Sequence, residues 1–525
     1  MTPPPKSALD QADAANLAVD APPSGYEAPH ADRSFFGHPA GLSTLFFTEM
    51  WERFSFYGIR PMLVLFMTTA LAAGGFGFDR PTASSIVGIY AGSVYLASLP
   101  GGWIADRWLG LRRSIWYGGL FIALGHISIA SSAFLGKPAF FGGLTLIVIG
   151  TGLLKPNISA IVGDLYPEGG ARRDAGFSVF YMGINLGATL GPLVTAGLRV
   201  SAGWHIGFGA AGVGMLIGVI TYRLRENRTL GQLGTTPSGT EAQRRMVRNV
   251  SLGALAVIAL VLALGFAGVL PISAVTVAEQ MRNVELVMAA AYFAYLFFFA
   301  GLTGDEKKRV AVIIVLFVFA TTFWAAFEQA PTSLNLFAQD FTDRHLFGFE
   351  IPPEWLQVVN SFFVITLAPV FGWLWLALGK RGLNPSSPAK FSAGLLLAAI
   401  GFLLMIPASN RVIAGGGVGV RVSILWLTFS YLFQTFGELS LSPVGLSSMT
   451  KLAPRKFVGQ MMGVWFLASS LGNVIAGLVG GNVDPNKLEE MPKLFQQTSL
   501  SLIVAAVLCG LLVFPIRRMM GEQET

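Results

Sequence analysis

Long apolar runs follow one another along almost the whole chain, and they constrain its fold more than any other feature. A run of about 20 apolar residues is long enough to span a bilayer as an α-helix. Of the 525 residues, 53% are hydrophobic and only 12% are charged, whereas soluble domains carry roughly 25% charged residues. The sequence therefore predicts an all-α polytopic membrane protein rather than several soluble domains.

The apolar runs form three groups. The first six lie at about 42–73, 84–105, 112–134, 140–166, 174–199 and 203–222. Two more lie at about 249–272 and 284–303. The last six lie at about 310–338, 355–379, 391–408, 420–449, 457–481 and 496–516. We therefore predict 14 transmembrane helices: two six-helix bundles with two extra helices between them, a plan common among secondary transporters with a site near the bilayer midplane.

The same pattern predicts the domain boundaries. We expect a disordered N-terminal tail at 1–37, an N-terminal bundle at 38–223, a cytoplasmic linker at 224–248, two added helices at 249–303, a C-terminal bundle at 304–518 and a tail at 519–525. The first tail has no charged segment followed by a short apolar run and a cleavage site, so we expect no signal peptide. We expect the added pair to lack central ionisable residues and to form a peripheral hairpin outside the substrate path.

Lysine and arginine residues predict the orientation in the membrane. With the N-terminus inside, 24 of the 36 basic residues fall on the inside, 9 fall on the outside, and Arg53, Arg60 and Lys155 lie within runs. Cytoplasmic loops carry such an excess. We therefore expect a multi-pass protein of the inner membrane with both termini cytoplasmic. The net charge of +7 then requires no nucleic-acid partner.

The first run carries Glu49, Glu52, Arg53 and Arg60 at bilayer depth. Charges in a bilayer are costly unless they face a bundle interior or water and find partners. Glu49 and Arg53 are four residues apart, as are Arg53 and Tyr57, so the polar groups form one stripe on an apolar helix. This stripe is a candidate functional site; an ion pair that only fixes helix packing is the alternative.

Further ionisable residues divide the two bundles by charge. Lys155 lies near the middle of its run, far from either end, and is followed by a proline; a lysine reaching to the membrane surface is the alternative. Apart from Glu49 and Glu52, the N-terminal half is cationic, whereas the C-terminal half carries Glu328 and Glu438. A cavity between the halves would suit a zwitterion, with its carboxylate on the N-terminal side and its ammonium on the C-terminal side.

Several motifs resemble those of known transporters. The loop at 102–113 resembles the loop motif of the major facilitator superfamily, although an ordinary basic cytoplasmic loop is the alternative. The stretch 49–60 looks like the E-x-x-E-R-F-x-Y-Y motif of the proton-coupled oligopeptide transporter (POT) family, with Phe56 in place of the first tyrosine. The segments 152–157, 180–187, 328–329 and 438–443 resemble that family's other signatures.

This resemblance, over about residues 35–520, implies a major facilitator superfamily fold. It also implies a proton-coupled symporter that imports di- and tripeptides by alternating access. The proton-coupling residues that it implies are Glu49, Glu52, Arg53 and Glu328. The peptide-binding residues that it implies are Tyr57, Arg60, Tyr95, Lys155, Tyr181, Asn185, Trp324, Asn360, Glu438, Ser442 and Trp465. Within this set, Arg60 and Lys155 correspond to partners of the peptide carboxylate, and Glu438 to the partner of the amino end.

Other classes of protein fit the sequence less well. It contains no His-Glu-x-x-His motif, no plausible serine–histidine pair within the runs and no Gly-x-x-x-x-Gly-Lys-Ser/Thr loop, which disfavours an enzyme and an ATP-driven pump. The single cysteine, Cys509, builds neither a disulfide nor a thiolate metal site.

We expect protons to be the coupling ion, with no cofactor or metal, and a monomer in the bilayer. A passive channel or sensor and a transporter of nitrate or a drug are the alternatives, but nitrate would leave Glu438 without a cationic partner.

Overall fold

The structure is a computed structural model that describes residues 32–346, 348–417 and 419–520. Its N-terminal half contains α2 (Ala40–Thr68), α3 (Arg80–Ile104), α4 (Leu111–Asp164), α5 (Gly170–Ala202) and α6 (Trp204–Leu230). An added hairpin follows, made of α7 (Glu241–Phe266) and α8 (Ala274–Phe298). The C-terminal half contains α9 (Gly304–Phe327), α10 (Asn335–Phe341), α11 (Gln357–Lys380), α12 (Ser387–Leu403), α13 (Met405–Ala414), α14 (Leu425–Leu452), α15 (Val458–Gly480) and α16 (Glu490–Met520).

Short elements connect these helices. They are the helical turns η1 (Leu71–Ala73), η2 (Ala105–Leu109), η3 (Ala330–Leu334), η4 (Pro353–Leu356) and η5 (Arg455–Phe457), and the strands β1 (Thr342–Asp343), β2 (His345–Leu346), β3 (Phe349–Glu350) and β4 (Val422–Ser423). β1 pairs in parallel with β4, and β2 pairs antiparallel with β3. Most of the predicted N-terminal tail and the residues 521–525 lie outside the described residues.

The predicted helices are present. Ten segments of the described chain are long and apolar enough to cross a membrane. One of them, α4, is two helices that meet at Gly136, where the backbone leaves the helical path at a φ of 67°. Three further long helices, α2, α8 and α14, carry ionisable side chains within their length. The all-α polytopic fold is confirmed, and each predicted run lies on a helix.

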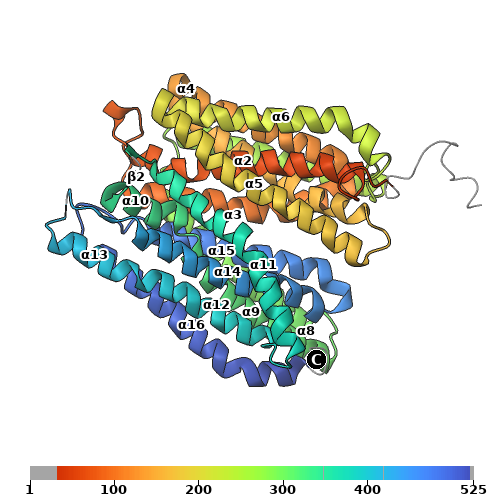
Figure 1. Cartoon of the computed structure of the whole chain (residues 1–525). Helices are drawn as coiled ribbons and strands as arrows, with labels where there is room; N and C mark the ends of the chain where they lie inside the picture. The colour runs from red at the N-terminus through yellow and green to blue at the C-terminus, as the bar shows by residue number, and fades with distance from the viewer. Residues whose placement is uncertain (1–31, 347, 418, 521–525) are drawn as a thin grey trace, which may run out of the picture.

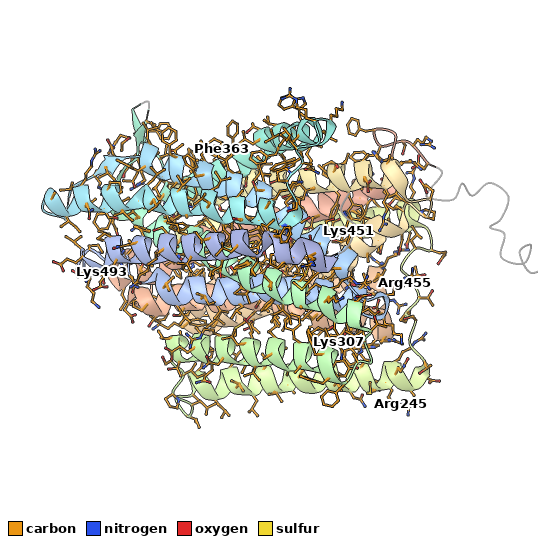
Figure 2. The ribbon with its side chains drawn as sticks, turned by 90° about the horizontal axis from the view of Figure 1, so that it is seen from below. Arg245, Lys307, Phe363, Lys451, Arg455 and Lys493 are labelled. Carbon is orange, nitrogen blue, oxygen red and sulfur yellow. The ribbon has the colours of Figure 1, made fainter. Side chains whose placement is uncertain are left out.

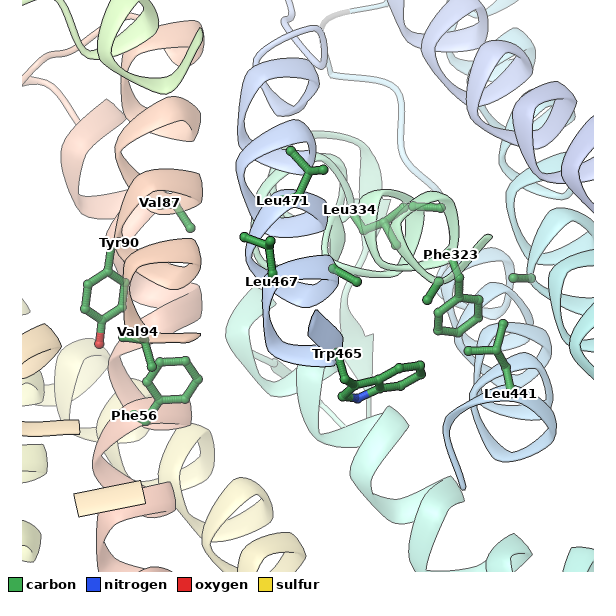
Figure 3. Close-up of a cluster of buried hydrophobic side chains, with 14 of the residues drawn as sticks. Phe56, Val87, Tyr90, Val94, Phe323, Leu334, Leu441, Trp465, Leu467 and Leu471 are labelled. Atoms are coloured by element: carbon green, nitrogen blue, oxygen red, sulfur yellow. The ribbon is translucent and has the colours of Figure 1, made fainter. Parts of the chain in front are cut away.

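The two halves meet along α3 and α15 (Figure 1). Glycines make this seam close: a Cβ at Gly88 would lie 2.8 Å from Gly477 Cα, and one at Gly92 would lie 2.8 Å from the Val474 side chain. Small residues let membrane helices approach in this way. Apolar side chains fill the seam around them, and Figure 3 shows this cluster, with Val87 and Val94 on α3 and Leu467 and Leu471 on α15.

The added hairpin packs against this seam from outside, with α8 contacting both α3 and α15. In α7 only Val247 is buried, so most of that helix faces the surroundings. The prediction that the pair lacks central ionisable residues is wrong, because Glu285 lies in the middle of α8 and is fully buried. The predicted linker at 224–248 is also mostly helical, since α6 continues to Leu230 and α7 begins at Glu241.

The two ends of the described chain lie at the same end of the molecule, which we call the terminal end; the opposite end is the distal end (Figure 1). Arg245, Lys307, Lys451 and Arg455 lie at the terminal end, and Lys493 lies at the distal end (Figure 2). Basic residues thus gather at the terminal end, in the arrangement that the loop charges predict for a cytoplasmic face.

The orientation is tested by reporter fusions in the loops that flank α7. A cytoplasm-dependent reporter fused after Gln232 is expected to be active, because this position lies at the terminal end between α6 and α7. The same reporter fused after Gly268, in the turn between α7 and α8, is expected to be inactive. A fusion after Gln232 that reads as external contradicts the orientation of the 14-span plan.

Candidate functional site

A cavity with a water-accessible volume of about 170 Å³ lies between the two halves. Helices α2, α3 and α5 line it from the N-terminal half, and α9, α11 and α14 line it from the C-terminal half. Eight of the predicted peptide-binding residues lie in its wall: Tyr57, Arg60, Tyr95, Tyr181, Asn185, Trp324, Asn360 and Glu438. The cavity therefore brings together residues from both ends of the sequence.

Three predicted residues do not line this cavity. Lys155 is partly exposed, and its Nζ lies 4.1 Å from the centre of the ring of Tyr95, which lines the cavity. Trp465 packs edge-on against the Trp324 ring at 6.5 Å between centroids. Ser442 lies one helical turn beyond Glu438 on α14, and its Oγ is buried with no hydrogen-bond partner in the described chain. Lys155 and Trp465 thus each contact an aromatic side chain that lines the cavity.

The sequence analysis missed several polar lining residues, among them Gln357, Tyr431 and Gln434. The Gln357 amide donates to Ala330 O at 2.7 Å and to Tyr431 Oη at 3.1 Å. These residues could have been found from helical periodicity, because they lie on the same helix faces as predicted site residues. Gln357 lies one turn before Asn360, while Tyr431 and Gln434 lie two turns and one turn before Glu438 on the same face.

The predicted proton-coupling group lies within the N-terminal half, outside the cavity wall. Glu49, Glu52 and Arg53 are all buried. Arg53 Nε lies 3.2 Å from Glu49 Oε1 and is also ion-paired with Glu52. Thr151 Oγ1 donates to Glu52 Oε1 at 3.4 Å. One guanidinium balances the charge of only one carboxylate, so a single added proton makes this group neutral.

Glu328, the fourth predicted proton-coupling residue, lies at the end of α9 and is ion-paired with Arg60 of α2. Arg60 Nη2 also donates to Asn473 Oδ1 of α15 at 2.9 Å. These contacts cross from one half of the protein to the other, and both side chains of the ion pair are buried. The guanidinium that was predicted to bind a peptide carboxylate therefore holds a carboxylate of the protein itself in this conformation.

Glu438 is in a different situation on the opposite wall. Its Oε2 accepts a hydrogen bond from the Asn360 amide at 3.2 Å, and the same amide donates to Thr435 Oγ1 at 2.9 Å. Within the described residues no lysine, arginine or histidine forms an ion pair with Glu438. A carboxylate offers only acceptors, so this position suits a donor such as an ammonium group.

The distal side of the cavity is closed by contacts between the halves. Arg80, at the start of α3, pairs with Asp340 of α10 at 2.6 Å and donates to Val483 O at 2.7 Å. Arg199, near the end of α5, pairs with Glu354 of η4 at 2.7 Å. With Arg60–Glu328, these are all the ion pairs that join the halves in the described chain, and none lies at the terminal end. The structure thus represents a distal-closed conformation.

Two helical bundles, a polar cavity between them and ion pairs that close one side define a secondary transporter of the major facilitator type. The sequence model of the POT family matches residues 112–493. This chain belongs to the POT family.

Known relatives agree with this assignment. The chain is 50% identical over 498 residues to the peptide transporter YePEPT of Yersinia enterocolitica, covering 94% of this chain and 97% of that protein. It is 36% identical over 506 residues to a di-/tripeptide transporter of Lactococcus lactis, covering 94% and 98% of the two chains. A crystal structure of a peptide transporter POT in complex with sulfate superimposes with a TM-score of 0.86 at 40% identity, covering 94% and 98%.

Replacing Glu328 by glutamine tests the competition for Arg60. The substitution removes the internal carboxylate, so we expect dipeptide affinity to rise by about tenfold, in line with the roughly 1.5–3 kcal/mol of a charge-assisted hydrogen bond. Proton-driven uptake is expected to fall in the same variant. Calorimetric binding and proteoliposome uptake measure the two effects. Weaker binding in Glu328→Gln would show that Glu328 holds the peptide rather than competing with it.

Proposed function

We propose that this chain is a proton-coupled symporter that imports di- and tripeptides by alternating access, driven by the inward proton gradient. The observation that carries the proposal is the pair of opposite charges on facing walls of one cavity, Arg60 on the N-terminal half and Glu438 on the C-terminal half. Relatives that cover almost the full length of the chain bear the names of peptide and di-/tripeptide transporters. A peptide is the zwitterion that matches this arrangement.

In the proposed complex the peptide carboxylate binds Arg60, whose planar guanidinium matches a carboxylate. Lys155, whose Nζ lies 4.1 Å from the centre of the Tyr95 ring, adds a second positive charge on that side of the cavity. The amino end binds Glu438, which Asn360 already holds in place, and Asn185 adds a polar group on the opposite wall. Because these partners act on backbone termini, they bind peptides with different side chains.

The side chains of the peptide then lie among the aromatic residues of the wall. These are Tyr57, Tyr95, Tyr181 and Trp324, together with Phe327. Trp465 lies behind Trp324 and fixes the position of its ring. Aromatic rings offer apolar area together with polar edges, and they accept side chains of varied shape.

Proton coupling follows from the competition for Arg60. When the peptide carboxylate takes Arg60, Glu328 loses its partner in a buried position and binds a proton, since an unpaired buried charge is costly. The group of Glu49, Glu52 and Arg53 binds or releases a further proton as its exposure changes. A ligand shifts a conformational equilibrium by its different affinity for the two states, and here peptide and proton together weaken a contact that closes the distal side.

We propose an inner-membrane location with both termini cytoplasmic, supported by the basic residues at the terminal end (Figure 2). In that orientation the closed distal end faces away from the cytoplasm, and the present conformation is inward-facing. Protons are the coupling ion, and the transporter acts as a monomer without a cofactor, metal or nucleic-acid partner.

The proposed function is tested by uptake of a labelled dipeptide into proteoliposomes. Accumulation is expected when the outside is made more acidic than the inside, because proton entry then drives the peptide against its own gradient. A protonophore that collapses the gradient should reduce uptake to equilibration. Equal accumulation with and without the gradient contradicts proton coupling and favours a passive channel.

The carboxylate partner is tested with a matched pair of ligands. Arg60→Ala is expected to weaken the binding of a free dipeptide by about 10- to 150-fold, the equivalent of roughly 1.5–3 kcal/mol. The same substitution should affect a C-terminally amidated dipeptide much less, because that ligand has no carboxylate to lose. Glu438→Gln with an N-acetylated dipeptide provides the mirror experiment. If Arg60→Ala weakens both ligands equally, Arg60 acts on structure or gating instead.

The Glu52→Gln variant tests whether proton coupling can be lost while peptide binding is retained. Glu52→Gln keeps the size of the side chain but removes its charge beside Arg53. We expect it to abolish proton-driven accumulation and to retain peptide counterflow, which needs no net proton movement. Loss of counterflow in Glu52→Gln would show that the proton group also shapes the peptide site.

A further inference from the structure

Glu285 is a buried acid in the added hairpin, away from both the peptide cavity and the Glu49–Glu52–Arg53 group. It lies near the middle of α8 and is fully buried against α3 and α15. Its Oε1 lies 2.6 Å from Ser470 Oγ of α15. Its Oε2 is also buried and has no hydrogen-bond partner in the described chain.

The two hydrogen-bond partners of Ser470 limit where the hydrogens of Ser470 and Glu285 can lie. Ser470 Oγ lies 2.8 Å from the carbonyl oxygen of Gly92 on α3 as well as 2.6 Å from Glu285. A serine hydroxyl has one hydrogen to donate, and a carbonyl oxygen only accepts. When Ser470 donates to Gly92, the short contact to Glu285 is satisfied only if the carboxyl group donates. Both hydrogen bonds therefore exist together only when Glu285 is protonated.

Among the described residues, none provides a counter-charge that would stabilise an ionised Glu285. α15 has no ionisable side chain. The ionisable side chains of α3 have other partners: Arg80 is ion-paired with Asp340. The Tyr90 ring stacks on Phe56, and the Tyr95 ring contacts the ammonium group of Lys155. The charged residues of α9 lie in its first turns, at 305–309. On α8 itself, Glu279 is exposed, and Arg282 donates to Asn283. Tyr292 donates to Gln460, and Tyr295 is exposed.

The position of Ser470 links this acid to the gate. Asn473 lies one turn further along α15 and accepts a hydrogen bond from Arg60, the partner of Glu328. The Gly92 carbonyl belongs to the close α3–α15 seam between the halves. Glu285, Ser470 and Gly92 therefore join the hairpin, the C-terminal half and the N-terminal half at one level of the molecule.

We propose that Glu285 is an additional proton-binding site, and that its protonated form holds α3 against α15 and so favours the distal-closed conformation. When Glu285 releases its proton, Ser470 donates to the carboxylate instead of to Gly92, and the seam loses a hydrogen bond between the halves. The equilibrium between the distal-closed and distal-open states then depends on pH even when no peptide is bound. This goes beyond the proposed transport cycle, which places its protons on Glu49, Glu52 and Glu328.

The test follows the distal opening with two spin labels on the purified full-length protein. Leu71 and Lys487 are exposed at the distal end, one on each half, and Cys509→Ser removes the native thiol. In the labelled background we expect the closed fraction to fall as the pH rises. Glu285→Gln should keep the closed fraction high across the titration, because its amide donates to Ser470 at every pH. Ser470→Ala should lower the closed-to-open ratio several-fold at low pH, as expected for loss of a hydrogen bond.

Glu279→Gln is the matched control, since it makes the same substitution on the same helix at an exposed position; its titration should equal that of the background. If Glu285→Gln also titrates like the background, the proposal is overturned. Infrared difference spectra between low and high pH give an independent measurement, and the carbonyl band of a protonated carboxyl should be smaller in Glu285→Gln. An unchanged band also overturns the proposal. Neither measurement uses peptide, so both stand apart from the dipeptide uptake that tests the proposed function.

Discussion

A charge inside a membrane protein needs a partner of opposite sign, a hydrogen-bonding shell or water, and this requirement organises the whole molecule. Arg60 satisfies it by pairing with Glu328 on the other half, so the two bundles are joined where the substrate is proposed to bind. Together with Arg80–Asp340 and Arg199–Glu354, this ion pair closes the distal side, and it occupies the proposed site of the peptide carboxylate. In the proposed cycle, the ligand that fills the site therefore also removes one of the contacts that close the distal side.

The sequence predicted the fold well because the bilayer imposes a simple rule on it. Each membrane helix must be about 20 residues long and mostly apolar, so even the break within α4 was visible as a gap between two runs around Gly136. The ends of α6 and α7 were predicted less well. These helices continue beyond the apolar residues, and the hydropathy pattern that marks a membrane span contains no information about where a helix stops in water.

The candidate site was predictable only in part. Motifs identified Arg60, Glu328 and Glu438, but they did not indicate that the first two would pair with each other, since a contact between distant helices depends on the conformation. Lys155 was predicted to bind the peptide, and in this conformation it contacts the Tyr95 ring, a neighbour that its position in the sequence does not reveal. Glu285 was overlooked because the predicted run began at residue 284, whereas α8 begins at Ala274 and places Glu285 near its middle.

The glycine seam has a consequence for obtaining other states of the protein. At Gly88 and Gly477 the two backbones approach so closely that any side chain forces them apart. A bulkier residue there acts as a wedge in the distal-closed state, and it leaves the ionisable groups and the cavity wall chemically intact. Substitution at these positions is therefore a route to crystals of the distal-open state that needs no bound antibody, inhibitor or altered proton site.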